Sequence, residues 1–249
     1  MRTFRFKRFE VRNEKSAMKV NTDGVLLGAA VPIDSSCIDV LDIGTGTGTI
    51  ALMLAQRISD RIPEWEKNVT VTSIDIDKDA AEEAAMNFRN SPWSEILSAR
   101  HISLKVLDAE ESGRKFGLIV SNPPYYDSSL TNPDCRKATA RHTGEAESCG
   151  LSFREVLEFA SRHLTTDGRV AVILPADQEA AMLRHGRMLG LYPSMILRIR
   201  TVERKKPARI VAAFTRERTQ VTEDMLTIME NGRYTEQYIS LTKDFYLFT

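Results

Sequence analysis

A glycine-rich segment constrains this chain more than any other stretch of its sequence. The residues Leu41-Asp42-Ile43-Gly44-Thr45-Gly46-Thr47-Gly48 follow a short apolar run, 37–41, which predicts a buried strand, and they precede residues 49–55, whose apolar positions have helical spacing. A strand, a glycine-rich turn and a helix form the context that a nucleotide-binding loop requires. The three glycines let the backbone turn sharply and approach a ligand with no Cβ atom in the way. The alternative is a tight turn without a ligand, but one or two glycines suffice for a turn. We therefore interpret Gly44, Gly46 and Gly48 as a cofactor loop.

The charge next to this loop indicates which cofactor it binds. Asp42 lies two residues before the first glycine. A dinucleotide site places a pyrophosphate at the helix N-terminus, where a carboxylate would repel it. S-adenosylmethionine has no phosphate and carries a sulfonium and an ammonium group. Asp42 therefore favours S-adenosylmethionine as the cofactor.

The composition narrows the functional classes. The 34 basic and 34 acidic residues give a net charge of zero and a pI near 6.9, so any contact with nucleic acid must come from local patches. The three cysteines, Cys37, Cys135 and Cys149, are odd in number and form no C-x-x-C pair, which argues against a disulfide framework or a structural zinc site. Cys135, His142 and Cys149 match no known metal-ligand spacing, and we expect no metal. With no membrane-length apolar run and no signal peptide, we expect a soluble cytoplasmic protein without a membrane contact.

Residues 1–36 are expected to form an N-terminal arm followed by a short helix. Phe4 and Phe6 alternate with basic residues, which predicts a short strand or an extended arm packed on the domain; a solvated arm is the alternative. Asp23-Gly24 is typical of a turn, and the apolar run after it predicts the helix. The arm carries a first basic cluster, Arg2 to Lys19.

Acidic residues follow two further predicted strands. The strand 69–74 ends at Asp75, where a carboxylate typically accepts hydrogen bonds from both hydroxyls of a ribose. Asp77 is expected to be the N-cap of a helix over 78–90. A third strand, around 102–106, is expected to end near Asp108, whose side chain is a candidate acceptor for the adenine amine of the cofactor; a loop or helix-capping aspartate is the alternative.

The segment Asn122-Pro123-Pro124-Tyr125 follows a fourth predicted strand, 116–121, and is the second strong signal. The two prolines hold the backbone stiffly. The Asn122 side-chain oxygen and the Pro123 carbonyl are then two acceptors for the two hydrogens of one planar amino group, and Tyr125 offers a flat face for stacking. A rigid proline turn is the alternative. Because open α/β sheets bind ligands at the carboxyl ends of their strands, we interpret Asn122, Pro123 and Tyr125 as catalytic residues and expect Asn122 to contact the cofactor as well.

The rest of the chain completes an α/β pattern. Residues 127–150 are polar and are expected to form a loop over the site. His142 within this loop is a candidate base, and an exposed histidine without a catalytic role is the alternative. Helices over 152–163 and 176–189 alternate with strands over 169–174, 192–199 and 208–214. A second basic cluster, Arg198 to Arg209, is expected in the turn of a C-terminal hairpin. Alternating strands and helices predict a mostly parallel sheet with helices on both faces and an antiparallel hairpin at its end, in a single domain over 1–249 with its core in 37–249.

The order of Asp42, the three glycines, Asp75, Asp108 and the Asn-Pro-Pro-Tyr segment resembles that of class I S-adenosylmethionine-dependent methyltransferases. The segments 6–9, 17–29, 91–93, 122–126 and 241–248 are similar to the bacterial tRNA(Val) adenine-N6 methyltransferase family. Asn21, where that family more often has glycine, and a longer loop around Trp65 depart from its pattern. The resemblance implies the Rossmann-like fold of these enzymes, with a seven-stranded sheet.

The resemblance also implies the reaction and the substrate. The expected reaction is methyl transfer from S-adenosylmethionine to the N6 amine of the adenosine 3′ of the anticodon in tRNA(Val). The anticodon loop is then the expected partner, and the RNA-binding candidates come from the arm, the loop and the second basic cluster: Lys19, Arg136, Arg141, Lys205, Lys206 and Arg209.

Two alternatives stay open at this point. A glutamine-amide methyltransferase of release factors shares the Asn-Pro-Pro-Tyr segment, but such enzymes generally carry a helical domain before the cofactor loop, where this chain has only about forty residues. A catalytically silent RNA-binding module is the other alternative, and the two acceptors at Asn122 and Pro123 argue against it.

Overall fold

The computed structural model describes residues 3–124 and 151–247. In the first of these ranges the elements are β1 (Thr3–Arg5), β2 (Glu10–Arg12), α1 (Thr22–Ala30), β3 (Asp39–Ile43), α2 (Thr49–Ser59), α3 (Trp65–Asn68), β4 (Thr70–Asp75), α4 (Lys78–Arg89), β5 (Leu97–His101), α5 (Leu104–Glu110) and β6 (Phe116–Ser121). In the second they are α7 (Phe153–His163), β7 (Leu164–Pro175), a 3-10 helix (Ala176–Gln178), α8 (Glu179–Met188), β8 (Tyr192–Val202), β9 (Arg209–Thr215), β10 (Thr222–Glu230), β11 (Arg233–Tyr234) and α9 (Glu236–Thr242).

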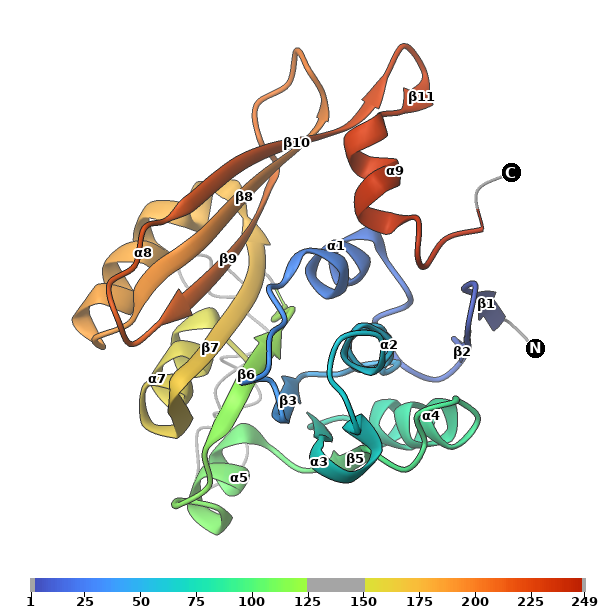
Figure 1. The fold of residues 1–249 in the computed structure, drawn as a ribbon, viewed down its shortest axis with the longest axis vertical. Helices are drawn as coiled ribbons and strands as arrows, with labels where there is room; N and C mark the ends of the chain where they lie inside the picture. The colour runs from blue at the N-terminus through green and yellow to red at the C-terminus, as the bar shows by residue number, and fades with distance from the viewer. Residues whose placement is uncertain (1–2, 125–150, 248–249) are drawn as a thin grey trace, which may run out of the picture.

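A central sheet organises these elements (Figure 1). Its strand order is β11-β10-β8-β9-β7-β6-β3-β4-β5, and the strands from β7 to β5 are parallel. The antiparallel pairing of β9 with both β7 and β8 is the expected C-terminal hairpin. Seven strands were expected, and the described residues contribute nine to this sheet, because β10 pairs in parallel with β8 and β11 then pairs with β10.

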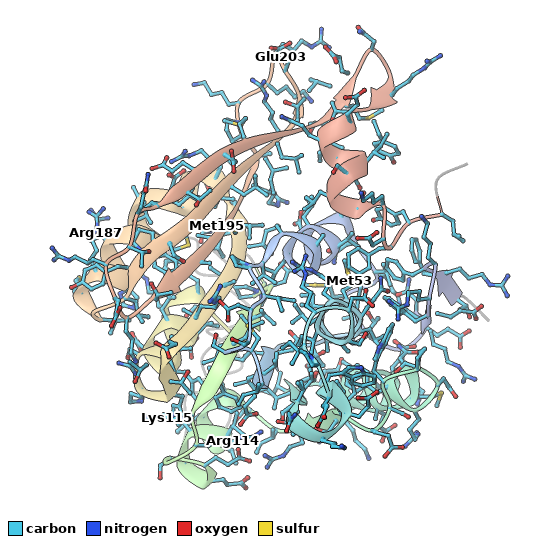
Figure 2. The ribbon with its side chains drawn as sticks, in the orientation of Figure 1. Met53, Arg114, Lys115, Arg187, Met195 and Glu203 are labelled. Carbon is cyan, nitrogen blue, oxygen red and sulfur yellow. The ribbon has the colours of Figure 1, made fainter. Side chains whose placement is uncertain are left out.

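Side chains on the two faces of the sheet form two separate cores. Along β6, Leu118 and Val120 belong to one core and Ile119 to the other, as the two-residue period of a strand requires. The first core is covered by α1, α2 and α4, and the second by α5, α7 and α8 (Figure 1). Helices α1 and α2 cross closely at Gly28, where a Cβ atom would lie 2.9 Å from the Met53 sulfur (Figure 2).

The N-terminal arm packs on the domain, as one of the two sequence interpretations predicted. Strands β1 and β2 pair with each other, and Phe6 and Phe9 are buried. Phe6 stacks on Phe9 and on Tyr246, and the Lys7 amide donates to the Phe245 carbonyl at 2.8 Å. The two ends of the chain therefore stabilise each other.

The third strand lies earlier in the sequence than expected. Ile102, Leu104 and Val106 alternate with polar residues as in a strand, yet β5 ends at His101 and α5 begins at Leu104. The Ser103 side chain accepts a hydrogen bond from the Val106 amide at 3.3 Å and caps this helix. A capping serine therefore overrides the apparent two-residue period.

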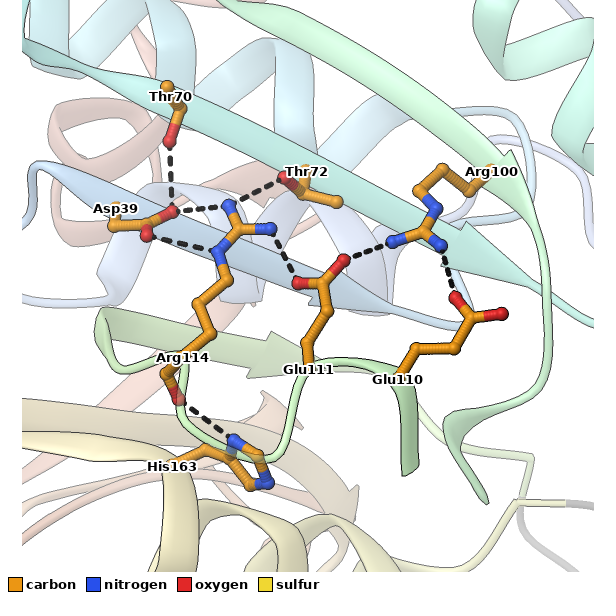
Figure 3. Close-up of polar contacts among 8 residues, drawn as sticks. All are labelled: Asp39, Thr70, Thr72, Arg100, Glu110, Glu111, Arg114 and His163. Atoms are coloured by element: carbon orange, nitrogen blue, oxygen red, sulfur yellow. Dashed lines mark hydrogen bonds and ion pairs between the residues drawn. The ribbon is translucent and has the colours of Figure 1, made fainter. Parts of the chain in front are cut away.

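A network of charged side chains closes the amino-terminal edge of the sheet (Figure 3). Arg114, just before β6, donates to Asp39 on β3 at 2.8 Å, to Thr72 on β4 at 3.1 Å and to Glu111 at 2.8 Å. Arg100 pairs with Glu111 and Glu110. Arg114 therefore joins β3 and β4 to the segment before β6, near the strand ends opposite the glycine-rich loop, and Glu111 connects it to Arg100 on β5.

Substitution of Gly117 in β6 should test how tightly this sheet is packed. A Cβ atom there would lie 1.7 Å from the Ser36 carbonyl oxygen, so Gly117→Ala should lower the free energy of unfolding by at least ~2 kcal/mol, as overpacking does. Gly113→Ala is the matched control, because no atom lies within 4 Å of its added Cβ. Urea unfolding of both variants measures the difference; equal midpoints would contradict the packing at β6.

Candidate active site

The glycine-rich loop connects β3 to α2 and has the conformation that its sequence predicts. Gly44, Gly46 and Gly48 all lie in the left-handed region, with φ of 73°, 57° and 81°. A Cβ atom on Gly48 would also lie 2.5 Å from the ring of Phe88 on α4. The three glycines are therefore required by backbone conformation, and the last one also by packing.

Asp75 lies at the end of β4, as expected, and its carboxylate is joined to the glycine-rich loop. Its Oδ2 accepts from the Gly46 amide at 2.8 Å, and its Oδ1 accepts from the Asp77 amide at 2.9 Å. Burial raises the pKa of Asp75 despite these two hydrogen bonds. Asp77 is the N-cap of α4, as predicted.

Asp42 is fully buried beneath the loop, so its side chain has no direct access to solvent. Its Oδ2 accepts from the Thr45 hydroxyl at 2.7 Å, whereas its Oδ1 has no hydrogen-bond partner among the described residues. Burial raises the pKa of Asp42 to about 7, although the bond from Thr45 opposes the rise and the negative Asp75 adds to it. In this structure Asp42 stabilises the loop through the hydrogen bond from Thr45.

Asn122 and Pro123 follow β6 directly beside the loop. Ser121 pairs in register with Ile43 on β3, so Asn122 lies beside Gly44. Asn122 is 6% exposed, and its side-chain nitrogen donates to the Met18 sulfur at 3.7 Å. A cavity of about 20 Å³, enough for about one water molecule, is bordered by Asn122, the loop and residues of the arm: Met18, Lys19, Val20 and Asn21. Tyr125 lies outside the described residues.

Asp108 does not lie at the end of the third strand, the position for which the adenine contact was expected. Asp108 belongs to α5, where it pairs with Arg162 at 2.6 Å and with His163 at 2.7 Å, and these pairs lower its pKa although burial opposes them. His163 in turn bonds the Arg114 carbonyl at 2.9 Å, within the network at the amino-terminal edge (Figure 3). The residues that do follow the third strand beside Asp75 are Ile102, whose amide donates to the Asp75 carbonyl at 3.0 Å, and Ser103.

The basic candidates divide into free and paired side chains. Lys205 and Lys206, with Arg204, are exposed in the β8–β9 turn and have no ion pair among the described residues. Arg209 is different, because its Nε donates to Asp23 on α1 at 2.8 Å and so ties β9 to α1. Lys19 donates to the Glu14 carbonyl at 2.7 Å. Arg136 and Arg141, like Cys135, His142 and Cys149, lie outside the described residues.

Sequence reasoning missed two side chains of α4 that hold the arm and the loop together. Glu83 and Asn87 are 4% and 2% exposed, on the same helix face as Ala80, Ala84 and Phe88. Asn87 donates to the Thr47 carbonyl of the loop at 2.8 Å and accepts from the Arg12 amide of the arm at 2.8 Å. The available signal was a pair of polar residues, four apart, within an otherwise apolar stripe.

Residues 3–124 and 151–247 contain neither a metal-binding cluster nor a membrane-spanning helix. No group of three or more His, Cys, Asp or Glu side chains lies close enough together to hold a metal ion. No helix is long and apolar enough to cross a membrane.

Comparison with known proteins relates this geometry to a family. A sequence model of the methyltransferase small domain matches residues 16–186. A tRNA1(Val) (adenine(37)-N6)-methyltransferase of Bacteroides fragilis is 40% identical over 98% of this chain and 97% of its own length. A tRNA1(Val) (adenine(37)-N6)-methyltransferase of Flavobacterium psychrophilum is 39% identical over 98% of this chain and 99% of its own length. Among solved structures, one described as a predicted O-methyltransferase from Agrobacterium tumefaciens matches with a TM-score of 0.67. The match covers 90% of this chain and 96% of the other chain. The sequence identity is 17%, so this match shows the fold alone.

The raised pKa of Asp42 predicts a pH dependence of stability. Between its ordinary value of 3.8 and about 7, the folded protein holds a proton that the unfolded chain has released. The free energy of unfolding should therefore fall as the pH rises through this window and level off above it. Asp42→Asn should reduce that fall by more than ~1 kcal/mol, measured by urea unfolding at several pH values. Asp167→Asn, at an exposed position, should keep the wild-type dependence; a fall of wild-type size in Asp42→Asn would contradict the assignment.

Proposed function

This chain belongs to the methyltransferase small domain family and, within it, to the tRNA1(Val) (adenine(37)-N6)-methyltransferases, and we propose that it methylates the N6 amine of the adenosine 3′ of the anticodon in tRNA(Val). One observation carries the chemical part of the proposal. The glycine-rich loop after β3 and the Asn122-Pro123 pair after β6 lie side by side at the carboxyl ends of neighbouring strands. A methyl donor and an amine held there would be adjacent.

The residues around the loop fit S-adenosylmethionine as the proposed cofactor. When bound, this cofactor supplies an electrophilic methyl group on a sulfonium. The left-handed glycines give the loop its sharp turn beside the cavity. Asp75 retains lone pairs for ribose hydroxyls beside the two amides whose hydrogen bonds it already accepts. When ionised, Asp42 places negative potential beneath the loop, and a cationic ligand there would favour this ionised form.

Asn122 and Pro123 are the proposed positioning groups for the amine. The lone pair of an adenine amine is delocalised into the ring, which makes the nitrogen a poor nucleophile. Two acceptors that hold its hydrogens favour a pyramidal nitrogen and aim the lone pair, an interaction stronger in the transition state than in the ground state. The burial of Asn122 keeps water from competing for its oxygen. Tyr125 is proposed to stack on the base.

The target base must leave its stack to reach this site. Unstacking costs a few kcal/mol in a duplex and less in a single-stranded loop, so an anticodon loop is a favourable substrate. Phosphates flanking the flipped base then need cations near the carboxyl edge of the sheet. Strand β8 runs in the same direction as β7, so the β8–β9 turn lies at that edge, and Glu203 marks the turn in Figure 2.

Mass analysis of tRNA nucleosides after incubation with the protein and isotope-labelled S-adenosylmethionine tests the proposal. We expect N6-methyladenosine from the wild-type protein, and a loss of kcat of at least ~100-fold in Asn122→Ala that exceeds any loss of cofactor affinity, since the acceptor acts mainly on the amine. Asn90→Ala, exposed at the end of α4, is the control for loss of an asparagine side chain. Methylation of a release-factor peptide instead of tRNA would overturn the proposal of an RNA substrate. Unchanged turnover in Asn122→Ala would show that the Asn-Pro-Pro-Tyr segment is only a structural turn.

The free cations of the β8–β9 turn predict how the RNA is held. Replacing Arg204, Lys205 and Lys206 together by alanine should raise KM for tRNA and reduce the slope of log affinity against log salt by roughly one per lost phosphate contact. The product should remain N6-methyladenosine, because phosphate contacts do not determine which base is recognised.

A second triple variant provides the control for net charge. Arg184, Arg187 and Arg218 are exposed near the opposite edge, and Figure 2 shows Arg187 far from Glu203. Their replacement by alanine should leave both KM and the salt slope near wild type. Equal effects of the two triple variants would show that net charge, and not the turn, controls RNA binding.

A further inference from the structure

Part of the N-terminal arm crosses the glycine-rich loop. We define residues 12–21 as the strap. Its Ser16 hydroxyl would lie 3.5 Å from a Cβ atom on Gly46, and its Met18 carbonyl oxygen 3.7 Å. The Met18 sulfur also receives the hydrogen bond from Asn122. The strap therefore contacts both the proposed cofactor loop and the proposed amine-positioning residue.

One carboxylate on α4 fixes the strap. Glu83 accepts three consecutive backbone amides: its Oε1 accepts from Glu14 at 2.7 Å and Lys15 at 2.9 Å, and its Oε2 accepts from Ser16 at 2.9 Å. Hydrogen bonds to a charged acceptor are about twice as strong as neutral ones. Without that acceptor, three amides at the edge of the site would need other partners. Burial opposes the charged form, but the amides outweigh it and lower the pKa of Glu83.

The same helix face also holds the loop beneath the strap. Asn87, one turn after Glu83, bonds the main chain of Arg12 through both its oxygen and its nitrogen and bonds the Thr47 carbonyl. Phe88 packs against Gly48. Helix α4 thus fixes the strap relative to the loop, and any displacement of the strap changes the walls of the cavity between Met18, Gly46 and Asn122.

We propose that Glu83 is a positioning residue for the cofactor site, which holds the strap closed over the glycine-rich loop through the amides of Glu14, Lys15 and Ser16. The inference rests on the proposed function, because the strap then covers bound S-adenosylmethionine. Glu83 itself touches neither the cofactor nor the amine in this scheme. It acts through the strap, and closure of the strap and cofactor binding stabilise each other by linkage.

Glu83→Gln is the sharpest test, since it preserves size while removing the charge and replacing one acceptor oxygen by a donor. We expect the Kd for S-adenosylmethionine, measured by titration calorimetry, to rise about tenfold. Amide hydrogen exchange at residues 14–16, measured by NMR, should become at least tenfold faster. In steady-state kinetics, the KM for the cofactor should rise by a larger factor than kcat falls. Glu95→Gln is the control, because the Glu95 side chain is exposed and makes no hydrogen bond or ion pair with the described residues.

The outcomes separate this inference from the proposed function. If the wild-type protein does not bind S-adenosylmethionine, both fail. If Glu83→Gln remains folded and binds the cofactor as tightly as wild type and the control, the positioning role alone is overturned. Should Glu83→Gln not fold, amide exchange of the wild-type protein provides the test. The amides of residues 14–16 should exchange more slowly with saturating S-adenosylmethionine than without it. Equal exchange rates would overturn the inference.

Discussion

The hydrogen bond from the Gly46 amide to the Asp75 carboxylate joins the two strand ends on which the rest of the site depends. Gly46 makes this bond from a left-handed conformation, which favours glycine. The bond ties the loop to the end of β4, while Asn122, just after β6, and the strap lie against the loop from other sides. Asp75 is partly buried for the same reason, which accounts for its raised pKa. A carboxylate that two amides already orient needs little rearrangement to accept hydroxyl groups.

Features that depend on local chemistry could be predicted from the sequence. Three glycines at alternate positions after an apolar run fix a strand, a turn and a helix, and the structure places Gly44, Gly46 and Gly48 accordingly. Asp77 caps α4 because its neighbours begin an amphipathic helix. The position of Asn122 beside Gly44 followed from a general property of parallel sheets, whose strand ends meet at one edge. The antiparallel pairing of β8 and β9 also followed from two apolar strands around a polar turn.

The errors arose where side chains distant in sequence decide the outcome. Residues 102–106 have the period of a strand, but the Ser103 side chain and the end of β5 at His101 make them a helix start. Asp108 consequently faces His163 and Arg162, far along the chain, which no local pattern reveals. Arg209 looked like part of a basic turn, yet Asp23 of α1 neutralises it. Glu83 and Asn87 were overlooked because charged and amide side chains on a helix are usually solvated, and only the fold shows what they bind.

Ion pairing within the fold bears on how a chain of zero net charge could hold the proposed tRNA substrate. Arg5, Arg8, Arg114, Arg198 and Arg209 form ion pairs within the molecule, so their charge is largely cancelled at short range. Arg204, Lys205 and Lys206 have no such partner among the described residues and protrude from the same sheet edge as the glycine-rich loop. Because ionic screening limits the reach of exposed charges to roughly 10 Å, the local excess near the site matters more for RNA than the sum over the chain. For the proposed substrate, the relevant quantity is thus the number of unpaired cations within reach of a base that Asn122 would hold, and the ion pairs of the fold determine that number.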